Sequence, residues 1–427
     1  MENKLRIVLI NHSFQKEYYY RRWQLFAQNY KNVEVYLLTP AKVDWYATKE
    51  YTFSGAETVY GKVIDEENFH IRLFRLNFFG WSWFSTDYKK IFKEIQPDLI
   101  YHVGTHRMLS LIQVAMVSHR VCPKAKLALF SRRGPASNLK LDKSKCRPKE
   151  WLKRRFRYIL LKQTWNYVRK NFDAIFCHYP DAVACFRLEG YEGPLYMQTQ
   201  VGVNEEWFHE DVEARHEIRK KYDIGDSTYV FGSASRFSAD KGIDVILKAL
   251  PADGDWKYLM MGTGSEEDLK RLRAIINERN LSEKVIETGF VDWFEMAKYW
   301  NAVDCAIHVP LTTPEWVETF SLAVIQPQIT KKPVIGDDSG SVPYQIGFDD
   351  MIVPEGNVEA LHNKIEWVLN HKEKASAIGL KMYKRTHDCF EVKHLNSMFY
   401  DTIVEDVQKG KYDENKHDMT KYTPKSI

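Results

Sequence analysis

Short apolar strands that alternate with helical segments are the feature that most constrains the fold of this chain. The second half shows them most clearly, as TYVFGSAS, KYLMMG, KVIETG, DCAIHVP and PVIGDD. The first half has similar runs at 5–10, 33–38, 98–104, 125–131 and 172–178. Strands of this length that are apolar on both faces are typical of a parallel sheet covered by helices on both sides. The pattern therefore predicts an α/β protein with one such sheet in each half.

The length of the chain indicates more than one domain. Its 427 residues are too many for a single hydrophobic core. Strand signals stop and charge rises in the stretch VGVNEEWFHEDVEARHE, so we place the domain boundary there. We predict a first domain over 1–203, a second over 204–388, and a helical segment with a polar tail over 389–427.

Composition excludes several classes of protein. The net charge of +4 is only mildly basic and does not by itself imply a nucleic-acid partner. The six cysteines are scattered without a CxxC pair, which argues against a zinc site or a disulfide framework and fits a reducing cytoplasm. The apolar run near the N-terminus is too short for a signal peptide, and no run is long enough to cross a bilayer. We expect a cytoplasmic protein that, if it meets a membrane, lies on the membrane surface.

Two loops of the second half follow predicted strands, where ligands of open parallel sheets bind. The loop SASRFSADKGID carries Arg236 and Lys241 beside a predicted helix N-terminus, a combination suited to a diphosphate. The alternative is a solvated surface loop. In MGTGSEED, Gly262 and Gly264 allow a close backbone approach to a ligand, although a plain strand-to-helix turn is the favoured interpretation.

A third loop, ETFSLAVIQP, places Glu318 and Gln326 eight residues apart. If a helix begins near Thr319 or Phe320, Glu318 lies at its mouth and Gln326 about 12 Å further along the axis. Pro327 predicts that this helix is short or bent. The alternative is that Glu318 only caps the helix and Gln326 is a surface residue.

The start of this helix would also supply backbone donors. The free N–H groups of Phe320, Ser321 and Leu322 would face a phosphate beside Glu318. A carboxylate and an amide oxygen both accept hydrogen bonds from hydroxyl groups. Glu318 would therefore hold sugar hydroxyls, and Gln326 could hold those of a ribose.

Taken together, these loops resemble the retaining, GT-B fold glycosyltransferases of family four. That family shows a "GRL…KG" loop, a "GxG.E" turn, a "GFV" strand end and an E-x7-E motif, and the stretches here are ASRFSADKG, GTGSEE, TGFVDW and ETFSLAVIQ. The likeness covers nearly the whole second half but only the outline of the first. It implies two Rossmann-like domains that face each other across a cleft, with a C-terminal helix that crosses back to the first domain.

The resemblance also implies roles for individual residues. Arg236 and Lys241 would hold the donor diphosphate, and Glu318 would contact the donor sugar. Gln326 would face the ribose, where it replaces the family's second acid and should weaken binding modestly. The residues that the resemblance places around the donor are Gly262, Gly264, Val291 near the base, Thr319, Phe320, Ser321, Leu322 and Gln326.

The acceptor side departs from the family. A histidine usually follows a first-domain strand there, whereas the matching strand in this chain ends FSRRGPAS. The candidates that remain for the acceptor side are His12, His106, Arg132 and Arg133.

The activity implied is transfer of a sugar, with retention, from a UDP- or GDP-sugar to a glycan or lipid-linked acceptor in surface polysaccharide or glycoconjugate synthesis. No metal or other cofactor is expected, because arginine and lysine neutralise the diphosphate. The DxD at Asp253-Gly254-Asp255 is interpreted as a solvated turn. Three alternatives remain: a non-catalytic relative that binds nucleotide or glycan as a partner subunit, a sugar-nucleotide epimerase, and a dinucleotide oxidoreductase. The last is disfavoured because LINHSFQKE has no glycine fingerprint.

A basic helix is predicted over 148–172. Its spacing gives an apolar face, an aromatic line and a basic line, formed respectively by Leu152, Phe156, Ile159 and Leu160, by Trp151, Tyr158 and Trp165, and by Arg155, Lys162 and Arg169. Such a helix can lie on an anionic membrane at its inner face. The alternative is that its apolar face packs on the domain core while the arginines are solvated.

Overall fold

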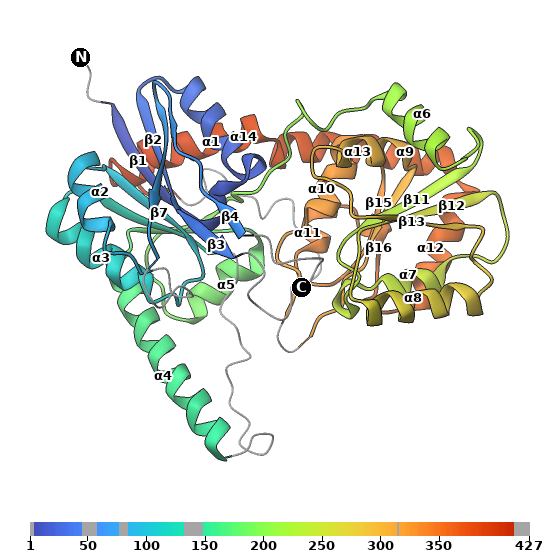
Figure 1. Ribbon diagram of the computed structural model, residues 1–427, viewed down its shortest axis with the longest axis horizontal. Coiled ribbons are helices and arrows are strands. Elements are labelled where there is room, and N and C mark those ends of the chain that lie inside the picture. Colours follow the sequence, from blue (N-terminus) through green and yellow to red (C-terminus); the bar gives the residue numbers. More distant parts are fainter. Residues whose placement is uncertain (1–3, 45–57, 77–83, 132–147, 314–315, 414–427) are drawn as a thin grey trace. The chain divides into compact units, whose positions relative to one another are not determined.

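The computed structural model describes residues 4–44, 58–76, 84–131, 148–313 and 316–413. These residues form two compact units (Figure 1). Unit 1 contains the described residues up to Gln200 together with those from Asn396 onward, and unit 2 contains Val201–Leu395. The chain therefore passes between the units twice.

Unit 1 is built on an eight-stranded sheet of order β10-β9-β8-β7-β1-β2-β6-β5. All of its strand pairs are parallel except that of β5 with β6. The strands β3 and β4 form a separate antiparallel pair. The bounds are β1 Leu5–Ile10, β2 Val33–Pro40, β3 Lys42–Asp44, β4 Thr58–Tyr60, β5 Ile64–Asp65, β6 Phe69–Phe74, β7 Leu99–Gly104, β8 Lys126–Ser131, β9 Ala174–Cys177 and β10 Leu195–Met197.

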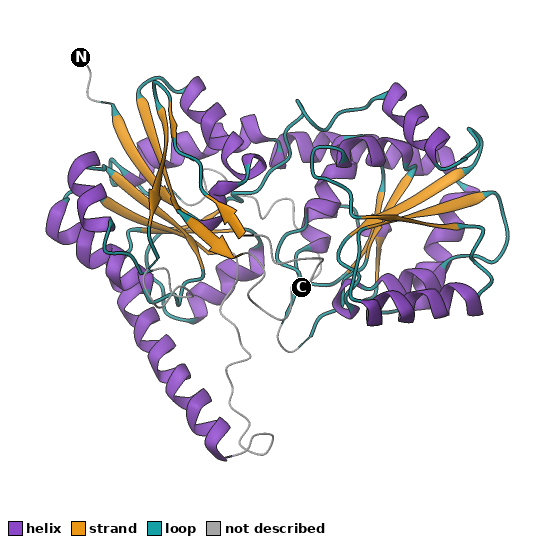
Figure 2. Ribbon diagram, in the orientation of Figure 1, coloured by secondary structure: helices purple, strands orange, loops and turns teal. Residues whose placement is uncertain are grey.

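Helices cover both faces of this sheet (Figure 2). They are η1 His12–Gln15, α1 Glu17–Asn29, α2 Tyr88–Ile95, α3 Ser110–Val121, α4 Pro148–Asn171 and α5 Pro180–Leu188. None of the described helices is both long enough and apolar enough to cross a membrane.

The C-terminal segment completes the core of unit 1. The helix α14 (Val392–Asp401) carries the chain back from unit 2, and the π-helical turn η8 (Thr402–Val407) follows it. The ring of Phe399 packs edge-on against Trp23 and Tyr101, with centroids 4.9 and 5.3 Å apart. The hydroxyl of Tyr196 donates to Asp406, 3.1 Å away.

Unit 2 contains a six-stranded, wholly parallel sheet of order β13-β12-β11-β14-β15-β16. The strands are β11 Tyr229–Ala234, β12 Trp256–Met261, β13 Val285–Gly289, β14 Cys305–His308, β15 Val334–Asp337 and β16 Ile352–Val353. The helices are α6 Val212–Lys221, η6 Ala239–Lys241, α7 Ile243–Ala249, α8 Glu266–Glu278, α9 Met296–Ala302, α10 Leu322–Ile329, α11 Val342–Ile346, η7 Asp349–Met351, α12 Val358–Asn370 and α13 Lys372–Phe390.

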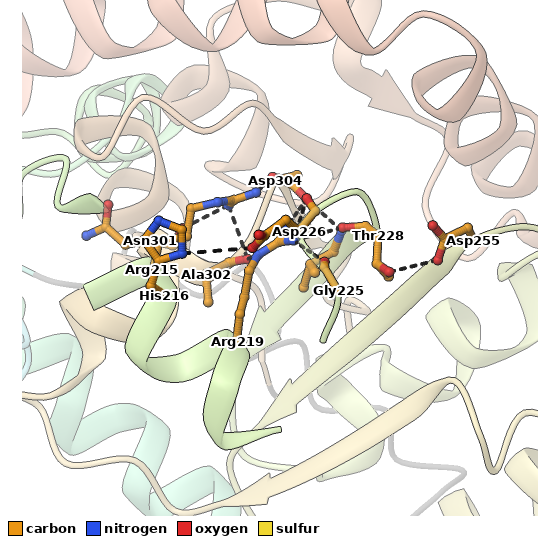
Figure 3. A network of polar contacts seen from close by, with 11 residues as sticks. Arg215, His216, Arg219, Gly225, Asp226, Thr228, Asp255, Asn301, Ala302 and Asp304 are labelled. Carbon is orange, nitrogen blue, oxygen red and sulfur yellow. Dashed lines mark hydrogen bonds and ion pairs between the residues drawn. The ribbon is translucent and has the colours of Figure 1, made fainter. Parts of the chain in front are cut away.

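An ionic network fixes α6 to the amino ends of two central strands of this sheet (Figure 3). The carboxylate of Asp304 accepts from Arg215 and Arg219, each 2.7 Å away, and from the backbone N–H of Val230 at 2.8 Å. The Arg219 side chain is 2% exposed and also donates to the carbonyls of Gly225, Asp226, Thr228 and Ala302. One carboxylate therefore pairs with two arginines and joins α6 to the start of β11.

The predicted α/β fold with two parallel sheets is confirmed. The apolar runs named above form β1, β2, β7, β8 and β9 in unit 1 and β11 to β15 in unit 2. The strands that the pattern did not reveal are β3 to β6, β10 and β16. Five of them have only two or three residues, and the six-residue β6, FHIRLF, includes His70 and Arg72. A polar residue in a short run hides the apolar signal on which such predictions depend.

Candidate functional site

Two loops meet at the carboxyl ends of β11 and β14, which are neighbours in the sheet of unit 2. The loop after β11 contains η6, which ends at Lys241, and then Gly242 in the left-handed region with φ of 66°. A Cβ on Gly242 would lie 1.9 Å from the carbonyl oxygen of Val309, the residue after β14. Only glycine permits this close approach, so it brings Lys241 next to the end of β14.

Lys241, His308 and Glu318 converge in a cluster that we call the carboxylate cluster. The Nζ of Lys241 lies 3.5 Å from Oε2 of Glu318, and Nε2 of His308 lies 3.6 Å from the same oxygen. Lys241 also lies over the ring of Trp316, 3.6 Å from its centroid. The side chains of Lys241, His308 and Glu318 are 12%, 7% and 11% exposed, so these charges interact in a largely water-excluded environment.

The surroundings of Glu318 keep it ionised. Burial by itself raises the pKa of this carboxyl, but the His308 imidazole, the Lys241 charge and the backbone N–H of Phe320 together lower it to about 2. Burial lowers the pKa of Lys241, while the charges of Glu318 and Asp240 act in the opposite direction. The positive charge of Arg236 also lowers the pKa of Lys241.

The helix that follows Glu318 begins later than the sequence predicted. α10 starts at Leu322 with Ser321 as its N-cap, rather than near Thr319 or Phe320. The reason is that Ser321 is extended and its backbone N–H donates to Oε1 of Gln345, 2.7 Å away. Of the three backbone donors expected to be free, that of Ser321 is therefore used within the protein, and that of Phe320 interacts with Glu318.

Gln326 lies inside unit 2 and is not a surface residue. It is 4% exposed, and its Oε1 accepts a hydrogen bond of 3.2 Å from the indole of Trp300 on α9. The helix that carries it has eight residues and contains Pro327, so the prediction of a short helix is confirmed. Gln326 is the fifth of the eight residues of α10, and the structure places its side chain against α9.

The glycines of the second loop pack against the first loop. Gly262 has φ of 135°, and a Cβ there would lie 1.9 Å from the carbonyl oxygen of Ser235. A Cβ on Gly264 would lie 2.9 Å from that of Phe237. These contacts account for both glycines without a ligand and agree with the plain strand-to-helix turn.

The remaining donor candidates lie around the same edge of the sheet. Val291 is buried just beyond β13, with β12 and β11 between that strand and β14. Thr319 is partly exposed beside Glu318. The ring of Phe320 packs edge-on against Phe390, 5.5 Å away. The structure therefore brings Lys241 and Glu318 together and leaves Val291 at the far strand.

A second carboxyl with a shifted pKa lies at the end of β15, the strand next to β14. Asp337 ends β15 and is fully buried, with Oδ1 accepting from the Ser339 backbone N–H at 3.2 Å. Among the described residues, Oδ2 has no hydrogen-bond partner. Burial, together with the nearby Glu355 and Asp338 charges, raises the pKa of Asp337 to about 8. Strongly shifted carboxyls often occur at functional sites, and the raised pKa favours the neutral form of Asp337.

Two of the acceptor-side candidates, His12 and His106, follow β1 and β7, which are neighbours in the sheet of unit 1. His12 follows β1, and its Nε2 lies 3.4 Å from the hydroxyl of Ser13. His106 is enclosed between the rings of Trp165 and Phe186, each with a centroid 5.2 Å away, and therefore contributes to packing. Arg132 and Arg133 lie outside the described residues.

Sequence reasoning missed His308 and Trp316. Both lie close to charges already singled out, and the only signal for His308 was a histidine at the carboxyl end of a predicted strand. Within the described part of the chain, no group of three or more histidine, cysteine or acidic side chains could hold a metal ion. The residues Asp253, Gly254 and Asp255 are exposed and precede β12, at the opposite edge of the sheet.

Comparison with known families gives this arrangement a context. Residues 214–385 match the family described as glycosyl transferases group 1. The chain is 26% identical over 188 residues to a GDP-mannose-dependent alpha-(1-6)-phosphatidylinositol monomannoside mannosyltransferase of Mycobacterium tuberculosis. The aligned region covers 42% of this chain and 48% of that protein. The chain thus matches about half the length of the curated relatives.

Solved structures resemble the chain over most of its length. Sucrose-phosphate synthase from Thermosynechococcus elongatus aligns with a TM-score of 0.66 and 16% identity, covering 93% of this chain and 97% of that one. Anabaena HepE, in complex with UDP and glucose, aligns with a TM-score of 0.64 and 15% identity over 93% and 99%. At such identities the likeness shows the fold alone, which is the GT-B fold.

Proposed function

From the premise that residues 214–385 form a glycosyl transferases group 1 domain, we propose that this chain is a glycosyltransferase that uses a UDP- or GDP-sugar. The observation that carries the proposal is the carboxylate cluster, in which Lys241 and Glu318 meet at the carboxyl end of a parallel sheet. This is the edge at which open α/β sheets bind ligands. It combines a cation suited to phosphate with a carboxylate suited to hydroxyl groups.

Sugar transfer from such a donor breaks the bond between the anomeric carbon and the diphosphate. Negative charge grows on the departing oxygen, and fixed positive groups aimed at that oxygen lower the barrier. In our proposal Lys241 and Arg236 supply this charge, so a metal ion is not required. Lys241 is held in place by Glu318 and by the ring of Trp316, which limits the reorganisation needed when a donor binds.

Glu318 would hold the sugar. An ionised carboxylate only accepts hydrogen bonds, and sugar hydroxyls supply donors. We further propose retention of configuration, with the leaving diphosphate taking the acceptor's proton on the same face. The acceptor would be a glycan or a lipid-linked sugar. The mycobacterial relative, named as acting on a phosphatidylinositol monomannoside, favours the lipid-linked class.

Donor binding should raise the melting temperature of the protein. A ligand present at 100 times its dissociation constant stabilises by about 2.7 kcal/mol, which corresponds to roughly 5–10 °C for a domain of this size. We expect one base to be preferred in a series of UDP, GDP, UDP-glucose and GDP-mannose. Thermal denaturation with each nucleotide measures this directly.

The same samples distinguish an enzyme from a binding subunit. Release of nucleotide diphosphate from the stabilising sugar nucleotide supports the transferase, whereas a shift without release favours the non-catalytic alternative. No shift with any of the four nucleotides would contradict the donor site itself. Lys248→Met, an exposed lysine on α7, serves as a variant that should respond like the unmodified protein.

Replacing His308 by leucine should weaken catalysis in a pH-dependent way. His308 helps to lower the pKa of Glu318, so its loss raises that pKa from about 2 towards the ordinary value. A carboxyl with a lowered pKa keeps its charge until the pH falls through that pKa. The acid limb of the rate profile should therefore move to higher pH, and kcat should fall about tenfold.

The conservative variant His308→Gln is the control for this effect. Its amide N–H can still donate towards Glu318, so activity near neutral pH should be partly restored. A purely structural role would lower the amount of folded protein without moving the acid limb. An acid limb that stays in place in a folded His308→Leu protein would refute the coupling between His308 and Glu318.

A further inference from the structure

The helix α4 consists of two parts that differ in burial. Near its C-terminal end, Trp165 and Val168 are buried, and the Trp165 indole donates to the carbonyl of Glu189 at 3.0 Å. Further towards the N-terminus, Phe156, Ile159 and Leu160 are 70%, 48% and 36% exposed. Figure 1 shows this part of α4 projecting away from the sheet of unit 1. The C-terminal part is therefore anchored, and the part before it presents apolar side chains to solvent.

The exposed and buried side chains lie on different sides of the helix. At roughly 100° per residue, Phe156, Ile159 and Leu160 share one face, in the i, i+3, i+4 relation. Trp165 and Val168 fall on nearly the opposite face. The alternative in which this apolar face packs on the domain core is therefore wrong for these three residues, because that contact is made by the other side of α4.

The charged residues of α4 are almost all basic. Arg155 and Lys162 are exposed next to the apolar face. Within Pro148–Asn171 the only acidic residue is Glu150, whereas the basic residues are Lys149, Lys153, Arg154, Arg155, Arg157, Lys162, Arg169 and Lys170. The whole chain, by contrast, is nearly balanced, with 61 basic and 57 acidic residues.

The basic charge of α4 distinguishes between two possible binding partners for its exposed apolar face. A second copy of the chain would bring two equally basic helices together, and like charges in contact are unfavourable. A surface of anionic lipid offers negative headgroups to the basic residues and an acyl boundary to the apolar ones. We propose that Phe156, Ile159 and Leu160 insert into an anionic lipid surface on which the N-terminal part of α4 lies.

The inference does not depend on the donor chemistry. It would, however, bring unit 1 to the place where a lipid-linked acceptor is found. Because α4 is anchored by Trp165 and by the Arg169 guanidinium, which donates to the carbonyl of Gly190 at 3.0 Å, such binding would hold unit 1 firmly against the membrane.

Flotation of the full-length protein with vesicles tests the proposal. We expect binding to vesicles that contain phosphatidylglycerol and little binding to phosphatidylcholine alone, with a decrease at high salt. The double variant Phe156→Ser, Ile159→Ser should reduce partitioning by tenfold or more, since each removes apolar area from the acyl boundary. Equal binding of this variant, or equal binding to both kinds of vesicle, would overturn the proposal.

Two further measurements keep the outcomes separate. Leu380→Ser changes an apolar side chain of unit 2 that is 53% exposed, and it should leave vesicle binding unchanged. Light scattering without lipid should show the same mass for the protein and for the double variant. If the unmodified protein forms a dimer and the double variant does not, the exposed face of α4 binds a second copy of the chain, and the lipid proposal is wrong. The nucleotide-induced melting shift should persist in the double variant, so failure of the donor proposal is recognised independently.

Discussion

Replacing Lys241 by methionine is expected to lower kcat/KM for sugar transfer by roughly ten- to a hundredfold. A hydrogen bond to a charged group contributes about 1.5–3 kcal/mol, and each 1.36 kcal/mol corresponds to a factor of ten in rate. Methionine fills a similar volume but carries no charge. The negative charge that develops on the leaving diphosphate is then no longer stabilised by the Lys241 ammonium group. Initial rates of nucleotide diphosphate release, measured with the sugar nucleotide that stabilises the protein, give this ratio.

A matched control is available on the next helix. Lys248→Met removes a lysine whose side chain is 50% exposed and which lies 4.0 Å from Asp244. It should leave kcat/KM unchanged. If a folded Lys241→Met protein, with the melting temperature of the unmodified chain, retains full activity, then Lys241 does not stabilise the leaving group and the proposed site is incorrect.

Replacing Asp304 by asparagine is expected to lower the free energy of unfolding by about 3–5 kcal/mol. Removing one partner of a buried ion pair leaves the other charge uncompensated, which is more costly than the pair itself is favourable. Here two guanidinium groups lose their carboxylate, and Arg219 is almost fully enclosed (Figure 3). Urea denaturation, followed by tryptophan fluorescence, measures the loss.

An exposed pair in the same unit provides the comparison. Arg273 and Glu287 make an ion pair at 2.8 Å with side chains 59% and 29% exposed. Exposed pairs contribute at most about 1 kcal/mol, so Glu287→Gln should have a small effect. Similar losses in Glu287→Gln and Asp304→Asn would show that the arginine network is not a special anchor of α6.

The sequence was sufficient to predict that Lys241 and Glu318 lie close together, but not which other side chains surround them. Lys241 and Glu318 are far apart in the chain, yet each follows one of two adjacent parallel strands, and the carboxyl ends of such strands meet at one edge. His308 escaped notice because a single histidine at the end of an apolar strand is more often part of the core. Its proximity to Glu318 depends on the register between strand and loop, which periodicity does not reveal.

Hydrogen bonds between distant residues account for the other differences. The Ser321 backbone donor was expected to be free, but Gln345, twenty-four positions later, accepts it. The alternative in which Gln326 is a surface residue is wrong, because α10 packs this side chain against Trp300. Both depend on how a helix packs, and spacing along the chain carries no information about that.

The return of the chain to unit 1 has a consequence for biosynthesis. The aromatic core around Trp23 and Tyr101 is closed by Phe399, so the N-terminal strands leave the ribosome long before their last packing partner has been translated. Unit 2 is continuous from Val201 to Leu395 and has all its strands available earlier. During synthesis the first half therefore exposes the apolar surface that Phe399 later covers. Such exposed surface is what chaperones bind, and unit 1, although translated first, is the last to complete its core.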